Sequence, residues 1–139
     1  MPTPDRPEPR FAVGVDEHLL EEDLAHATAA GRAAIAPLID QLKSSGVPFS
    51  WLKRCQAEGR DGTQLTGCVK IYIPHPDGPW GAVLAGDKLA TVPTLVLLAA
   101  GRRHPVQPWT PSVYQVAHKR LPQIVARDLR TEKPDAPLG

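Results

Sequence analysis

The run Thr94–Ala100 (TLVLLAA) constrains the fold of this chain more than any other segment, because it is apolar on both faces. A strand without a polar face belongs inside a sheet, covered on both sides or flanked by other strands. The run leads directly into Gly101-Arg102-Arg103-His104. Binding groups are often found where a rigid element ends. We therefore expect a basic working surface at this end of the strand.

Two more strands are predicted before the apolar run. Cys68–Ile73 alternates with period two, and Trp80–Ala85 returns after a proline-rich turn, so the two segments predict a hairpin. A simple three-strand meander would leave Thr94–Ala100 at an edge. We therefore predict that the alternating segment Phe11–Val15 pairs on its free side. The first hairpin strand should present Val69, Ile71 and Ile73 on one face and Cys68, Lys70 and Tyr72 on the other.

Helical patterns follow the first strand and close the chain. Asp16 can cap a first helical stretch, in which Pro37 requires a kink or a second helix beginning nearby. A last helix should begin near Pro111-Ser112, with Tyr114 and His118 on a face other than its inward stripe. The predicted fold class is α+β, with an N-terminal strand and helical segment, an antiparallel three-strand segment in one small sheet, and a closing helix. The inward stripe comprises Val113, Ala117, Leu121 and Ile124.

The length of 139 residues fits one domain. We expect disordered tails at residues 1–9 and 131–139, because both are rich in proline and charge, and a single domain at 10–130. No apolar run could cross a bilayer, and no secretory leader pattern is present. Cys55 and Cys68 could form a bridge, but two cysteines make neither a secreted disulfide framework nor a metal motif. We expect reduced thiols in a cytoplasmic protein without a metal, a cofactor or a membrane partner.

Charge is distributed unevenly along the chain. The first helical stretch is acidic, whereas basic residues dominate from Arg102 onward. Arginine matches phosphate, aromatic rings stack on bases, and histidine moves protons near neutral pH. An RNase that uses the RNA 2′-hydroxyl needs only a base, an acid and cations, and no metal. The candidate site residues are Arg102, Arg103, His104, Tyr114 and His118 for catalysis, and Lys70, Tyr72, Trp80, Lys119 and Arg120 for substrate binding.

Several of these candidates also fit a purely structural role. Lys70 and Tyr72 could line a solvated sheet face, and Trp80 could belong to the core. His118 could simply pack against Tyr114. The arginine pair is the stronger candidate, because it leaves an interior strand at a fixed place.

The order of these segments resembles the RelE/ParE superfamily of bacterial toxins, and especially its HigB-like branch. The resemblance spans Phe11 to about Ile124 in layout and Cys68–Leu121 in detail. It implies an endoribonuclease toxin that acts on mRNA, free or on the ribosome, and is held inactive by a cognate antitoxin protein. The segments that carry it are Leu65–Pro74, Asp77–Leu84, Leu95–His104 and Pro111–Leu121.

The resemblance also assigns roles and exposes one departure. Arg102 and Arg103 would bind phosphate, His104 or His118 would transfer protons, and Tyr72 or Tyr114 would position the base. Relatives often carry an arginine on the second strand of the hairpin, where this chain has Gly81. Without that arginine, one cation that would activate the phosphate is missing from this strand. Lys70 on the neighbouring strand could take its place.

Two other functions fit the sequence. One is a non-catalytic module of the same fold that binds nucleic acid or a protein, which Gly81 favours. The other is a small interaction protein that uses its acidic first helix, around Glu21 and Glu22, as the contact surface.

Overall fold

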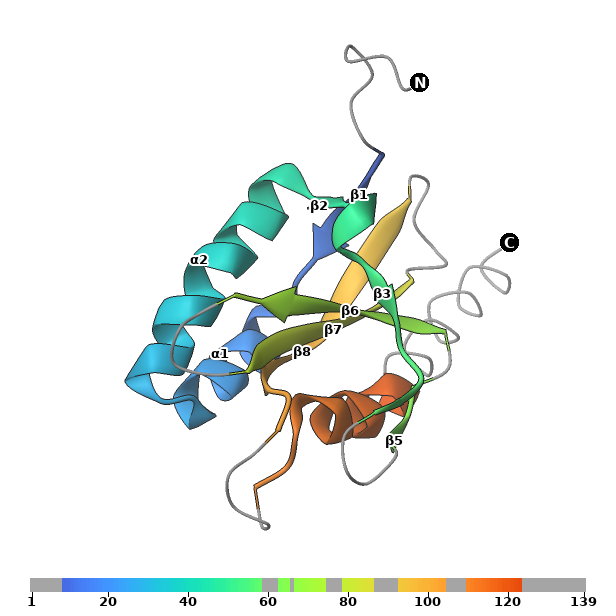
Figure 1. The fold of residues 1–139 in the computed structure, drawn as a ribbon. Helices are drawn as coiled ribbons and strands as arrows, with labels where there is room; N and C mark the ends of the chain where they lie inside the picture. Colours follow the sequence, from blue (N-terminus) through green and yellow to red (C-terminus); the bar gives the residue numbers. More distant parts are fainter. Residues whose placement is uncertain are drawn as a thin grey trace, which may run out of the picture.

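The computed structural model describes residues 9–58, 63–65, 67–74, 79–86, 93–104 and 110–123. Within these residues the fold is α+β, as predicted (Figure 1). The expected tails fall almost wholly outside the described residues, as does Ile124 of the predicted inward stripe.

One mixed sheet organises the molecule. Its strand order is β2-β1-β8-β7-β6-β3, so the predicted three-strand segment is the centre of a sheet of six strands. β1 runs parallel to β8, and the other pairs are antiparallel. The predicted pairing of the N-terminal strand with the apolar strand is confirmed, and β8 is internal. The strands are β1 (Arg10–Gly14), β2 (Val47–Pro48), β3 (Lys53–Arg54), β6 (Cys68–Ile73), β7 (Trp80–Gly86) and β8 (Thr94–Arg102).

The segment between β2 and β6 contains short elements. A 3-10 turn covers Phe49–Trp51, and a separate two-stranded ladder joins β4 (Ala57–Glu58) to β5 (Thr63–Gln64). Of the described residues in this segment, only those of β3 pair with the main sheet.

The predicted N-terminal helical segment divides at Ala27–Thr28. Asp16 caps α1 (Glu17–His26) by accepting hydrogen bonds from the backbone N–H groups of His18 and Leu19, at 3.0 and 3.3 Å. Thr28 caps α2 (Ala29–Ser45) through Gly31 N–H. The break therefore lies well before Pro37, and α2 continues through that proline. Pro37 is exposed, so water can satisfy the carbonyl that its missing N–H leaves unpaired.

The closing helix covers residues 113–123 in the described part of the chain. Ser112 Oγ accepts from Gln115 N–H, and Gln115 Oε1 accepts from Ser112 N–H, which is a reciprocal N-terminal cap. The predicted start near Pro111-Ser112 is confirmed. Tyr114 is buried with Val113 and Ala117, so the expected separate face for Tyr114 and His118 is wrong for the tyrosine.

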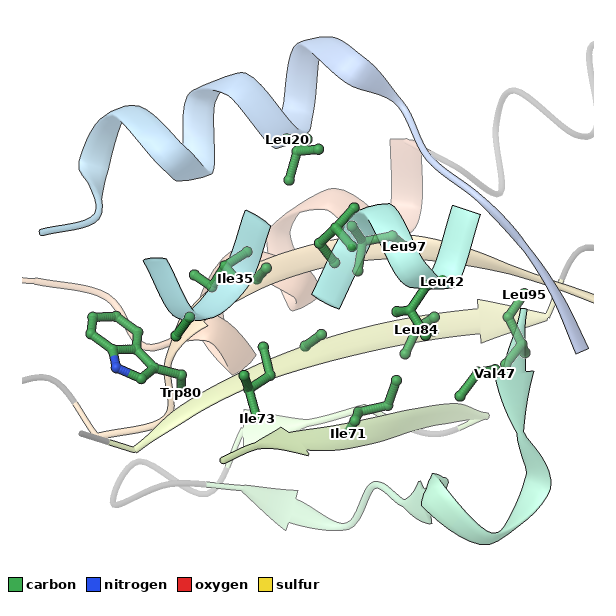
Figure 2. Packing of buried hydrophobic residues seen from close by; sticks show 14 residues of the cluster. Leu20, Ile35, Leu42, Val47, Ile71, Ile73, Trp80, Leu84, Leu95 and Leu97 are labelled. Carbon is green, nitrogen blue, oxygen red and sulfur yellow. The ribbon is translucent and has the colours of Figure 1, made fainter. Parts of the chain in front are cut away.

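Two apolar clusters lie on opposite faces of the sheet. Helices α1 and α2 pack on one face, where Ile35, Leu42 and Trp80 belong to the core (Figure 2). The closing helix packs on the other face, against Val83 and Leu98. β8 supplies buried residues to both clusters, which explains why its sequence has no polar face. The alternation predicted for β6 is also confirmed, because Ile71 and Ile73 join the first cluster and Cys68 the second.

Candidate nucleic-acid interface

Tyr72 on β6 is surrounded by cationic side chains. Arg103 Cζ lies 4.3 Å from the centroid of the tyrosine ring, and the Nζ atoms of Lys53 and Lys70 each lie 5.4 Å from it. All three distances are within the range of cation–π attraction. Tyr72 remains 41% exposed. We call these four residues the Tyr72 cluster.

Strand register assembles the cluster from three strands. Lys53 on β3 is the partner of Lys70 on β6, and alternation places Lys70 on the same face as Tyr72. Arg103 follows β8, and its N–H donates to Pro79 O at 2.8 Å, which extends the pairing of β7 with β8. The arginine therefore approaches Tyr72 from the far side of β7.

Gly81 provides the path that Arg103 takes across β7. Gly81 is paired with Tyr72 on one side and with Gly101 on the other. A Cβ atom at position 81 would lie 2.9 Å from Arg103 Cγ and 3.1 Å from Cδ, so the arginine stem lies directly over the glycine. Where relatives often carry an arginine on this strand, Arg103, which follows β8, places its side chain over Gly81 instead.

The two adjacent arginines separate onto opposite faces of the sheet. Arg102 Cζ lies 5.0 Å from the ring centroid of Trp80, which is buried on the face covered by α1 and α2. The ring of Trp80 is also close to Gly31 of α2, so it belongs to the core. Adjacent residues of a strand alternate between faces, and β8 continues through Arg102. Only Arg103 reaches the Tyr72 cluster.

The arginines are held by stacking on rings. The Nε atoms of Arg102 and Arg103 are buried and have no hydrogen-bond partner among the described residues. Their guanidinium groups lie over the rings of Trp80 and Tyr72, respectively.

The other predicted residues lie at different distances from this cluster. Tyr114 is buried beneath it, with its ring centroid 5.7 Å from Lys70 Nζ. His104, His118 and Lys119 are exposed. Within the described residues, no hydrogen bond, ion pair or ring contact joins these three to the Tyr72 cluster. Of the predicted site residues, Lys70, Tyr72 and Arg103 are brought together, whereas Arg102 lies on the other face of the sheet and the candidate proton carriers have no contact with the cluster in the described part of the chain.

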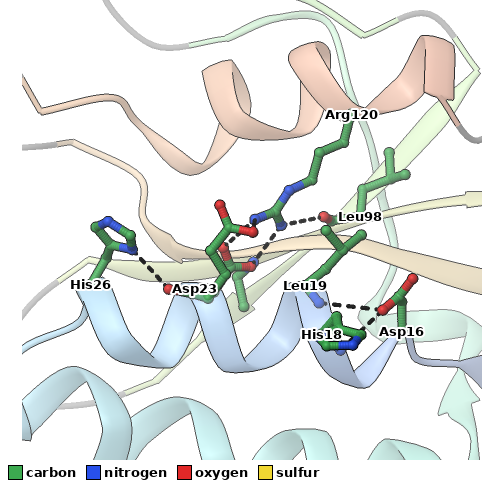
Figure 3. A network of polar contacts seen from close by, with 9 residues as sticks. Asp16, His18, Leu19, Asp23, His26, Leu98 and Arg120 are labelled. Carbon is green, nitrogen blue, oxygen red and sulfur yellow. Dashed lines mark hydrogen bonds and ion pairs between the residues drawn. The ribbon is translucent and has the colours of Figure 1, made fainter.

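Arg120, predicted to bind substrate, lies in the interior. It forms a two-pronged ion pair with Asp23 of α1, at 2.8 and 3.0 Å (Figure 3). It also donates to Leu98 O at 2.8 Å, and Asp23 accepts from Ala100 N–H at 2.9 Å. Pairing of β8 with β1 ends at Val96. Beyond that point, the Asp23–Arg120 pair satisfies backbone groups of β8 as a neighbouring strand would.

Lys53 is the member of the cluster that sequence reasoning missed. Its strand is only two residues long and shows no alternation. The basic pair Lys53-Arg54 was the available signal, but its register against Lys70 is a tertiary feature.

The described residues show neither a metal-binding cluster nor a membrane-spanning helix. In them, no group of three His, Cys, Asp or Glu side chains is arranged to hold a metal ion. None of the helices in this part of the chain is long and apolar enough to span a membrane.

Comparison with known proteins gives one weak likeness in fold. No family model matches the chain, and no curated protein matches its sequence. Among solved structures, the chain is similar to a double arginine-to-alanine mutant of the E. coli toxin RelE in the free state. The two are 17% identical, the match covers 81% of this chain and 98% of that chain, and the TM-score is 0.41.

Proposed function

We propose that the Tyr72 cluster binds the phosphate backbone of RNA. The observation that carries the proposal is the convergence of Lys53, Lys70 and Arg103 on one exposed aromatic ring. Among the described residues, neither Lys53 nor Arg103 forms an ion pair with a carboxylate, so their charge is available to an anion. Phosphate contacts from cations and stacking of bases on aromatic rings together favour single-stranded RNA.

The activity that we propose is cleavage of mRNA by a RelE-like toxin, without a metal ion. The 2′-hydroxyl of RNA would attack the adjacent phosphate, and Arg103 with the two lysines would stabilise the negative charge of the phosphorane. His104 or His118 would move the protons. A cognate antitoxin would be the protein partner that restrains the activity.

The alternative is a nucleic-acid-binding module that does not cleave. One observation favours it: His104 and His118 lack contact with the Tyr72 cluster within the described residues. This module would use the same cationic surface, and its binding would weaken with salt as counterion release requires.

The test compares Arg103→Ala with Arg102→Ala, because the two neighbours have the same charge and opposite faces. Purified proteins would be titrated with single-stranded RNA at several salt concentrations, and induced cultures would be followed for growth and mRNA cleavage. Loss of one charged hydrogen-bonding contact should weaken binding about tenfold for Arg103→Ala. Arg102→Ala should keep the wild-type affinity, provided that thermal unfolding shows both variants to be folded.

The outcomes separate the two functions. RNA cleavage and growth arrest by the wild type, lost in Arg103→Ala, support the toxin. Salt-sensitive binding without cleavage supports the module. Absence of any RNA binding by the folded wild-type protein would contradict both.

A further inference from the structure

Cys55 and Cys68 lie directly opposite each other across two antiparallel strands. The register of β3 with β6 pairs Lys53 with Lys70 and Arg54 with Val69. One step further, Cys55 N–H donates to Cys68 O at 3.1 Å, so the cysteines continue this ladder. Residues opposite each other in such a ladder have Cβ atoms about 4.5–5.5 Å apart on one face of the sheet. Their Cα separation of about 5.5 Å is within the range of disulfides, and the Cβ atoms must approach to about 4.5 Å or less for the bond to form.

The two thiols share one apolar environment. Neither is in a disulfide, and both belong to the cluster beneath the closing helix, with exposures of 6% for Cys55 and 2% for Cys68. Burial raises the pKa of Cys68, so this thiol stays protonated at neutral pH. Cys55 directly follows the edge strand β3 and lies between the exposed residues Arg54 and Gln56. Cys55 is therefore the thiol that a reagent from solution reaches first.

We propose that Cys55 and Cys68 form a reversible dithiol–disulfide pair that is oxidised by a low-molecular-weight disulfide. The Cys55 thiolate attacks the reagent, forms a mixed disulfide and releases one thiolate, which takes up the proton that Cys55 lost. The sulfur of Cys68 then attacks Cys55 Sγ, loses its proton and releases the second thiol. Two protein thiols are oxidised and one reagent disulfide is reduced to two thiols.

The bond would secure the weakest strand of the sheet. β3 joins the sheet through only two paired residues, and one of them is Lys53. A disulfide one step beyond the ladder would fix this strand to β6 and close a ring of about 14 residues. The site depends on register and burial alone, and it stands whether or not the Tyr72 cluster binds RNA.

The experiment measures how readily the pair oxidises in the folded and the unfolded protein. The full chain would be equilibrated with reduced and oxidised glutathione, with and without denaturant, then acid-quenched, alkylated and mapped by mass spectrometry. This equilibrium gives the effective concentration of one cysteine thiol with respect to the other. If the disulfide fits the fold, that concentration should be about 100-fold higher in the native protein than in the denatured chain, as expected for a ring of this size. The oxidised protein should also unfold at a higher temperature, and dithiothreitol should reverse the shift.

Single variants test the order of attack. Cys68→Ala should accumulate glutathione on Cys55, whereas Cys55→Ala should remain largely unmodified under native conditions. A native effective concentration at or below that of the denatured chain would overturn the proposal. So would disulfides formed mainly between two protein molecules.

Discussion

Arg120 and Arg103 show two ways in which this fold uses a guanidinium group. Arg120 is buried, is paired with Asp23 and donates to Leu98 O. Arg103 is half-buried, lies on the ring of Tyr72 and has two lysines beside it. Both arginines lie in the basic second half of the chain, so composition does not distinguish them.

The difference lies in charge compensation. A buried ion pair contributes to the fold as a unit, because removal of one partner leaves the other charge desolvated and unpaired. A cation on an exposed ring retains unused hydrogen-bond donors and adds to the local positive field. We therefore expect changes near Arg120 to affect stability and changes near Arg103 to affect binding.

Asp23→Ala should have the largest effect on stability. It removes the carboxylate that pairs with Arg120 and the acceptor of Ala100 N–H, so two buried groups lose their partner. We expect the free energy of unfolding to fall by about 3–5 kcal/mol, measured by urea denaturation. Asp23→Asn should lose less, because an amide oxygen can still accept the backbone bond.

Glu22 supplies the matched control for that measurement. Its carboxylate lies 3.8 Å from the same guanidinium, but its side chain is 61% exposed. Glu22→Ala should change the unfolding free energy by less than about 1 kcal/mol. Equal losses for Glu22→Ala and Asp23→Ala would contradict the contrast between buried and exposed partners.

Gly81→Ala should have an intermediate effect and act on both properties. The added methyl group meets the stem of Arg103 and Ile71 O, so the arginine must move from its place over β7. We expect a stability loss of about 1–3 kcal/mol and weaker RNA binding, by a smaller factor than for Arg103→Ala. Gly86→Ala on the same strand is the control, since its Cβ would meet no atom within 4 Å. Unchanged RNA affinity in folded Gly81→Ala would show that the position of Arg103 is unimportant.

Lys43→Ala should have the smallest effect. Lys43 forms an ion pair with Glu17, and this contact raises the pKa of Lys43 above its ordinary value of 10.5. A raised lysine pKa adds stability below the unfolded pKa and loses it as the pH rises through the folded pKa. The lysine therefore adds no pH dependence to stability near neutrality. Because both side chains are exposed, solvent and salt weaken the attraction between the two charges. Thermal unfolding at pH 6 to 8 should match the wild type, and a clear shift would show that the pair is more than a surface contact.

Local pattern predicted much of the fold. Alternation in Cys68–Ile73, the two-faced apolar run and the cap at Asp16 each depend on near neighbours in the chain, and each is confirmed. The second helix begins at Ala29 rather than near Pro37, because the proline is a visible signal, whereas the cap at Thr28 and the packing of Gly31 against Trp80 are not.

The candidate site was less accessible to prediction. The separation of Arg102 from Arg103 follows from alternation once β8 is known to continue through Arg102, but the apolar pattern ends at Ala100. The interior place of Arg120 depends on Asp23, which is 97 residues away in the chain. Nothing local marks that pairing, and a basic helix looks the same whether its arginine meets solvent or a carboxylate.

The pairing of Asp23 with Arg120 also protects the backbone of β8 from pairing with a strand of another chain. An internal strand with unpaired backbone groups is a template to which another chain can add, and such edges lead to aggregation. Here one end of β8 is closed by side chains from a helix early in the chain and a helix near its end. During synthesis that edge stays open until residues 113–123 have emerged, so truncation before this helix should produce a self-associating chain.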